Sequence, residues 1–130
     1  MQALVLDFDG VLADSAPECF EVALRTYVAL HPGTGIAARE PASLWQDFLA
    51  LLPLGNRAED FGVALAALEA GVALRDQAAY DAFRDALPPG WLTTFHRHFY
   101  EQRDAFAAAE PEAWCALNPP YAPFLALLQR

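Results

Sequence analysis

The sequence contains no lysine: its basic residues are eight arginines, set against 17 acidic residues, and the formal net charge is -9. Nucleic acids are densely anionic and are bound mainly through basic side chains. This charge balance therefore argues against a nucleic-acid partner. The lack of lysine also excludes any reaction step in which this chain itself would supply a lysine amine.

Cysteine is scarce as well, because Cys19 and Cys115 are the only two and no CxxC pair is present. That usage favours a reducing compartment over a disulfide framework. No basic segment precedes the first apolar run, and no apolar stretch reaches the roughly 18 residues that a membrane span requires. We therefore expect a cytoplasmic protein with no membrane partner.

The sequence is rich in apolar residues, which make up 55% of its 130 positions, and it also contains ten prolines and seven glycines. A chain of this length can bury a real core. We expect one modest folded domain rather than a disordered chain.

The first element is a short apolar run, QALVLDF at residues 2–8, followed by an Asp-Gly turn signal. A continuous run of this kind is typical of a strand buried on both faces. Such a strand must pair its backbone with neighbouring strands, and the remaining sequence predicts none. Either the strand pairs with something outside these 130 residues, or the chain is an incomplete piece of a larger α/β protein. We expect the second.

The rest of the chain has helical periodicity. Ser15 is the predicted N-cap of a helix reaching about Leu30, with Glu18 closing a capping box. Asn56, three residues before Glu59, predicts a similar helix start. The sequence as a whole predicts helices at about 16–30, 41–52, 57–71, 75–87 and 91–109, a short helical turn at 114–117 and a final piece at 121–130.

The densest motif follows the first run: D-x-D-G-V-L-x-D-S. It resembles the first motif of the haloacid dehalogenase-like (HAD) hydrolase superfamily, specifically its phosphatases and phosphomutases with a helical cap after the first strand. The resemblance implies a Rossmann-like α/β core, represented here by its first strand and catalytic loop (1–15), then a helical cap (16–117) and a helix returning to the core (118–130). The chain itself would be predominantly helical. The positions that match the motif are Asp7, Asp9, Gly10, Val11, Leu12, Asp14 and Ser15.

The resemblance also implies a chemistry. Asp7 would attack phosphorus and form an aspartyl-phosphate, while Asp9 would protonate the leaving oxygen and later accept a proton from water. A Mg2+ ion held by the Asp7 carboxylate and the Asp9 carbonyl would offset the repulsion between anions. Gly10 would let the backbone turn where a side chain would obstruct the phosphate. The predicted function is hydrolysis of a small phosphorylated metabolite.

Other interpretations stay open. Asp7 and Asp9 could form a solvated Asx-type turn without chemistry, and Asp14 and Ser15 are better explained as helix caps. The family's later motifs, a Ser or Thr, a Lys or Arg and an acidic pair, are not identifiable, so the 130 residues alone should hydrolyse little. A sugar phosphomutase would use the same aspartates. A non-catalytic helical module could instead donate its first strand to a partner's sheet.

Weaker candidates lie in the helical part. Arg57 could reach over the active site and bind a substrate anion, although an exposed side chain at a helix start is the simpler interpretation. His96 and His98 are two residues apart and should point to different faces, so they do not predict a metal pair. The stripe Trp91, Phe95, Phe99 and Phe106 is interpreted as core, and only its exposure would favour a pocket or a homodimer surface. Asp76, Asp81 and Asp85 are expected on a solvated helix face.

Overall fold

The computed structural model describes residues 5–128, and this part of the chain is predominantly helical, as the sequence predicts. Seven α-helices follow one another, with two short 3-10 turns between them. Their bounds are α1 Ala16–Leu30, η1 Ile36–Ala38, α2 Pro41–Leu51, η2 Leu52–Leu54, α3 Ala58–Ala70, α4 Gln77–Asp85, α5 Trp91–Ala109, α6 Pro111–Ala116 and α7 Ala122–Leu128.

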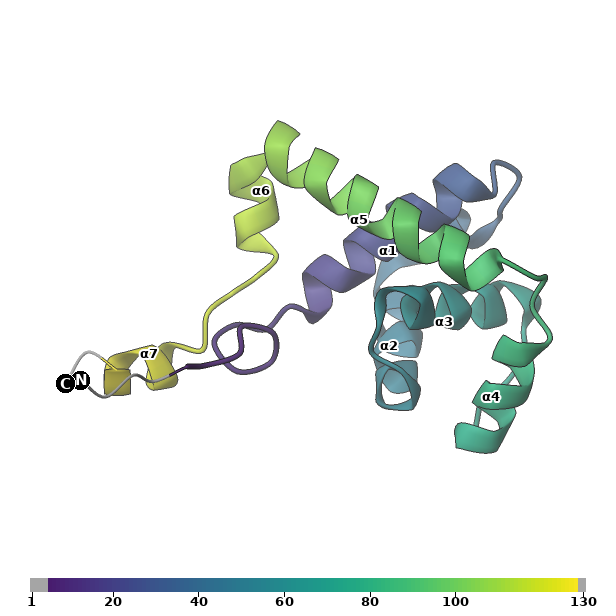
Figure 1. Cartoon of the computed structure of the whole chain (residues 1–130), viewed down its shortest axis with the longest axis horizontal. Coiled ribbons are helices and arrows are strands. Elements are labelled where there is room, and N and C mark those ends of the chain that lie inside the picture. Colours follow the sequence, from purple (N-terminus) through teal and green to yellow (C-terminus); the bar gives the residue numbers. More distant parts are fainter. Residues whose placement is uncertain (1–4, 129–130) are drawn as a thin grey trace.

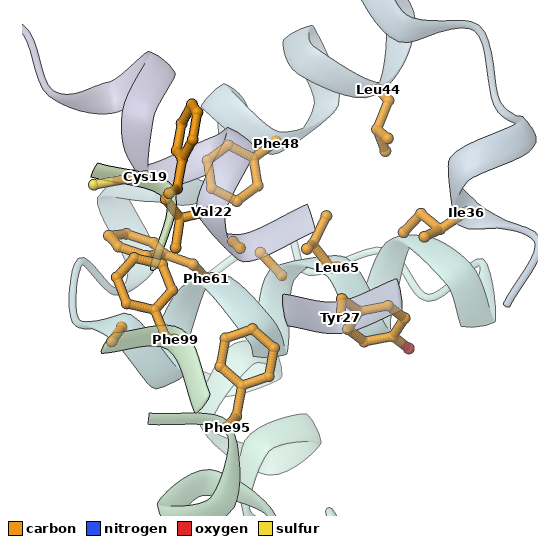
Figure 2. Close-up of a cluster of buried hydrophobic side chains, with 14 residues drawn as sticks. Cys19, Val22, Tyr27, Ile36, Leu44, Phe48, Phe61, Leu65, Phe95 and Phe99 are labelled. Carbon is orange, nitrogen blue, oxygen red and sulfur yellow. The ribbon is translucent and has the colours of Figure 1, made fainter. Parts of the chain in front are cut away.

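Three helices, α1, α3 and α5, pack mutually and form the centre of the molecule (Figure 1). Figure 2 shows the aromatic and aliphatic side chains that converge between them and α2. Val22, Phe48, Leu65 and Phe95 are completely buried there. Three residues of the predicted α5 stripe, Phe95, Phe99 and Phe106, are core, because they are at most 4% exposed, whereas Trp91 is partly buried.

A glycine sets the separation of α3 and α5. A Cβ atom at Gly62 would lie 2.7 Å from the ring of Phe95, closer than any ordinary contact. The missing side chain at position 62 therefore lets the Phe95 ring lie against the α3 backbone. Glycine lowers helix stability by roughly 1 kcal/mol relative to alanine, and close packing of the two helices offsets that loss.

The ends of the described chain form a separate feature, which we call the terminal arm: residues 5–15 together with residues 118–128. In Figure 1 these two segments lie side by side, away from α1–α6, which we call the helical body. The Asp14 amide donates to the Pro119 carbonyl at 2.9 Å, and the Tyr121 amide donates to the Leu12 carbonyl at 3.0 Å. These bonds bring the DxD motif next to the segment that leads into α7.

The predicted buried strand does not form in residues 5–8, and residues 2–4 lie outside the described residues. Val5 is 90% exposed and Phe8 is 49% exposed. The only extended pairings among residues 5–128 are isolated bridges from Ala13 to Asp9 and to Pro120. The physical reason is that a strand needs a partner for its backbone groups, and the part of the chain described here offers none.

Two helix starts also differ from their predictions. Ser15 is the N-cap of α1, but its side chain makes no cap hydrogen bond, and the Asp14 carboxylate accepts from the Ala16 amide instead. Glu18 is turned into the interior rather than back to the cap. The N-cap of α3 is Arg57, one residue later than predicted.

No helix within residues 5–128 is both long enough and apolar enough to cross a membrane.

Candidate functional site

A cavity of about 460 Å3 lies where the terminal arm meets the helical body. Its wall combines the DxD turn and the start of α1 with the residues around the start of α3 and the middle of α5. This arrangement brings together residues that are far apart in the sequence. The groups that carry the argument below are Asp9, Gly10, Arg57, His96, Tyr100 and Arg103.

The two aspartates of the motif occupy different positions relative to this cavity. Asp9 lines it, whereas Asp7 does not, and both side chains are exposed. An Asp7 carboxylate oxygen accepts a hydrogen bond from the Phe8 amide at 2.8 Å. The structure therefore places the predicted acid-base residue in the cavity wall and leaves the predicted nucleophile out of that wall.

Gly10 lies at the point where the motif turns. Its φ of 70° is in the left-handed region, which glycine adopts without strain. The turn closes on the Phe8 carbonyl, which accepts from the amides of Leu12 and Ala13 at 3.0 and 3.2 Å. A Cβ at Gly10 would meet nothing within 4 Å, so the glycine serves backbone conformation and not protein packing.

Arg57 reaches the cavity from the start of α3, as the sequence suggested it could, but carboxylates surround its guanidinium. Its Nε and Nη2 donate to Asp60 at 3.1 and 3.4 Å, and its Nη1 lies 3.4 Å from Glu59. The Asp60 carboxylate also accepts from the Arg57 amide and the Tyr80 hydroxyl. Arg57 is thus both a cavity residue and part of the α3 start.

The same network fixes the charge of Asp60. Burial raises the pKa of this carboxyl, but hydrogen bonds from Arg57 and Tyr80 outweigh burial and hold the pKa below its usual range. Burial and the bond to Asp60 raise the pKa of Tyr80 above its usual range. An ionised Asp60 carboxylate that accepts from a neutral phenol therefore holds Arg57, which lines the cavity.

Sequence reasoning missed a second polar network. Glu18 of α1 is 1% exposed, and its carboxylate accepts from Arg103 of α5 at 2.8 and 2.6 Å and from the Trp114 indole of α6 at 3.0 Å. Three helices are joined at one buried carboxylate. Nothing in the sequence separates this glutamate from a capping residue, because its partners lie 85 and 96 positions away.

Cys19, the next residue of α1 after Glu18, borders the cavity. Burial, reinforced by the charge of Glu18, raises the pKa of its thiol to about 12. The side chain is therefore a neutral thiol at physiological pH. It lacks the thiolate character that a cysteine nucleophile requires.

The two histidines of α5 contact different carboxylates, which confirms that they point to different faces. His96 Nδ1 lies 2.8 Å from Glu59, and His98 Nδ1 lies 2.9 Å from Glu101. His96 borders the cavity, whereas His98 does not. The predicted acidic face of α4 also takes a structural role, because Asp76 is the N-cap and accepts from the Ala79 amide.

The donor chemistry of the DxD turn suits Mg2+, which often takes one or two carboxylates and completes its shell with water and phosphate oxygens. Asp7 and Asp9 provide such oxygens on an exposed turn. Among residues 5–128 no three His, Cys, Asp or Glu side chains are grouped closely enough to hold an ion by themselves. The two aspartates could thus provide part of a magnesium shell.

Comparisons with protein-family models, with curated proteins and with solved structures give no match to this chain. A functional proposal must therefore rest on the motif and on the cavity. The cavity is the stronger of the two, because it joins the motif to side chains that no sequence pattern connects with it.

Proposed function

We propose that this chain supplies the catalytic turn and the helical cap of a cytoplasmic, Mg2+-dependent phosphoric monoester hydrolase of the HAD-like type. Its substrate would be a small phosphorylated metabolite. The observation that carries the proposal is the shared cavity: Asp9 and Gly10 of the motif face the same space as Arg57 and Arg103 of the helical body. A small molecule held there would contact both parts.

The two aspartates of the motif divide the proposed reaction, Asp7 as nucleophile and Asp9 as acid and then base. An Asp7 carboxylate oxygen bonds to phosphorus as the ester oxygen leaves, and Asp9 gives that oxygen its proton. Water then attacks the aspartyl-phosphate, Asp9 takes the proton from water, and the Asp7 carboxylate is restored. A bound Mg2+ would offset the negative charge that carboxylate and phosphate bring together.

The proposed reaction also requires catalytic groups that are not identifiable in these 130 residues. Asp7 is exposed and outside the cavity lining, so its final position requires the α/β core that the motif implies. The core would also supply the Ser or Thr, the Lys or Arg and the acidic pair. The exposed apolar side chains of Val5, Phe8 and Leu127 fit this proposal, because a core packed on the terminal arm would cover them.

The same exposed arm supports the rival function, a non-catalytic module that donates a strand to a partner's sheet. A phosphomutase differs only in transferring the phosphoryl group to a sugar instead of water. Reading the coding frame beyond Arg130 separates module from enzyme, since the enzyme requires the three missing motifs there.

The decisive assay uses the whole protein encoded by that frame and measures release of inorganic phosphate from an aryl phosphate. We expect activity that requires Mg2+ and falls at least about 1000-fold in Asp7→Asn. In Asp9→Asn we expect a loss of about 100-fold to 10,000-fold. Asp104→Asn, an exposed carboxylate of α5 outside the cavity, is the matched control and should keep full activity. Full activity of Asp7→Asn would exclude it as the nucleophile.

A further inference from the structure

Arg103 differs from the other cavity residues in how firmly it is held. Its Nε and Nη2 donate side by side to the two oxygens of Glu18, at 2.8 and 2.6 Å. Glu18 is 1% exposed and is itself fixed by the Trp114 indole. A buried carboxylate that accepts two hydrogen bonds from one guanidinium sets the plane and direction of that group before any ligand arrives.

One nitrogen of this guanidinium remains available. Within residues 5–128, Nη1 of Arg103 has no hydrogen-bond acceptor, whereas Nη2 also donates to the Cys19 sulfur at 3.8 Å. The side chain is 23% exposed, and it lines the cavity. The guanidinium carbon lies 5.0 Å from the ring centre of Phe99 and 5.5 Å from that of Tyr100. Aromatic rings at this distance support the planar cation and limit its movement.

Arg57, the cation suggested by the sequence, is less well prepared to bind an anion. Each of its guanidinium nitrogens faces Glu59 or Asp60, and its side chain is 62% exposed. A ligand would have to displace those carboxylates and order a mobile side chain, which lowers affinity. Arg103 requires neither change, so it is the better-prepared donor in the cavity.

The local charge indicates which ligand this donor suits. Glu18 balances the charge of Arg103, and Asp9, Asp14 and Glu59 also border the cavity. An anion is therefore not drawn in by net positive charge. It is selected by hydrogen-bond geometry, and a guanidinium donates to the oxygens of a carboxylate or of a phosphoryl group. Because the proposed function places the phosphoryl group at Asp9 and Gly10, the group left for Arg103 is a carboxylate.

We propose that Arg103 binds the carboxylate of the substrate, and that the substrate class is a small phosphorylated carboxylic acid. The phosphoryl half of this assignment rests on the proposed function, which places that group at Asp9 and Gly10. The carboxylate half rests on the geometry of Arg103 and is tested with a ligand that has no phosphoryl group. The two halves can be tested separately.

The test records the side-chain resonances of Arg103 by NMR in the 130-residue chain, at constant ionic strength with Mg2+ present. Propionate should shift the Arg103 signals, whereas propionamide, its neutral isostere, should not. Phosphonoacetate and 3-phosphonopropionate are then compared with methylphosphonate, which lacks the carboxylate. At least one of the two acids should bind about tenfold more tightly or better, the factor worth one charge-assisted hydrogen bond.

A charge-neutral double variant, Glu18→Gln with Arg103→Gln, removes the guanidinium without leaving a buried charge, and it should lose the tenfold preference. Its matched control is Arg97→Gln with Glu101→Gln, an exposed pair on the same helix, which should keep the preference. If circular dichroism shows that the first variant does not fold, the response of the Arg103 signals to propionate in the unmodified chain decides whether the carboxylate subsite exists.

The outcomes separate the two proposals. Arg103 signals that respond to propionate, with no added affinity from a phosphonate group, support the carboxylate subsite and count against the proposed function. Equal binding of methylphosphonate and the carboxylated phosphonates overturns the subsite and leaves the proposed function standing. Arg103 signals that respond to no carboxylate overturn the subsite as well.

Discussion

The helical body and the terminal arm bury their apolar residues to very different extents. In the body, Val22, Leu65 and Phe95 are fully buried, whereas in the arm Val5 is 90% and Leu127 is 63% exposed. Burial of an aliphatic or aromatic side chain is worth roughly 1.5–3 kcal/mol. The body therefore has a core of its own, while the arm keeps apolar surface that a further element could cover.

The largest expected effect comes from paired aromatic substitutions in the two regions. Phe95→Ala should lower the free energy of unfolding by about 3–5 kcal/mol, because it leaves a cavity between α3 and α5. Phe8→Ala should change it by less than about 0.5 kcal/mol, because this ring is half exposed in the arm. Urea denaturation of the whole chain measures both. Equal losses would show that the arm is as tightly packed as the body.

A smaller effect is expected from the carboxylate that binds Arg57. Asp60→Asn should cost about 1.5–3 kcal/mol at neutral pH, since Asp60 accepts bonds from Arg57 and Tyr80 as an anion. Asp85→Asn, on the exposed side of α4, is the matched control and should cost less than about 0.5 kcal/mol.

The pH dependence of that carboxylate has a defined sign. Burial raises the pKa of Asp60, but bonds from Arg57 and Tyr80 bring it below its unfolded value of about 3.9. Its contribution is therefore complete at pH above about 4 and is lost as the pH falls through the folded pKa. Urea denaturation between neutral and acid pH should give a flatter profile for Asp60→Asn than for the unmodified chain. Identical profiles would contradict the assigned charge.

The smallest effect is one of local opening and requires no substitution. Amides of the DxD turn, such as those of Gly10 and Leu12, should exchange with solvent far faster than amides in the middle of α3 and α5. The turn is bonded largely to itself, whereas the helices open only when their shared core opens. Hydrogen exchange followed by NMR gives both rates, and strong protection of the turn would overturn the contrast between arm and body.

Several parts of the fold could be predicted because their signals are local. The 91–109 helix has the predicted bounds, and Gly71 ends α3 in the left-handed conformation expected of a helix C-cap. Apolar spacing and stop residues act over a few positions, so the sequence contains them directly. The buried strand was predicted from the same kind of pattern, and it does not form in residues 5–8 because pairing also needs a neighbour.

The candidate site was only partly predictable for the same reason. Asp9 and Gly10 stand out as a motif, and Arg57 was named as a cation that could face them. Glu18 was assigned to a capping box, because its spacing from Ser15 fits one. Its actual partners come from α5 and α6, and no local rule connects residues so distant in the chain.

The amino-acid sequence by itself determined the acidic, lysine-free character of this protein, the positions of most of its helices, and a DxDG turn. These depend on residue type and on spacing within a few turns. Only the tertiary structure decided that the turn and the α5 arginine share a cavity, that Glu18 fixes Arg103, and that the arm keeps its apolar side chains exposed. Those features depend on which helices pack together, and packing is set by the complementary shapes of surfaces that lie far apart in the chain.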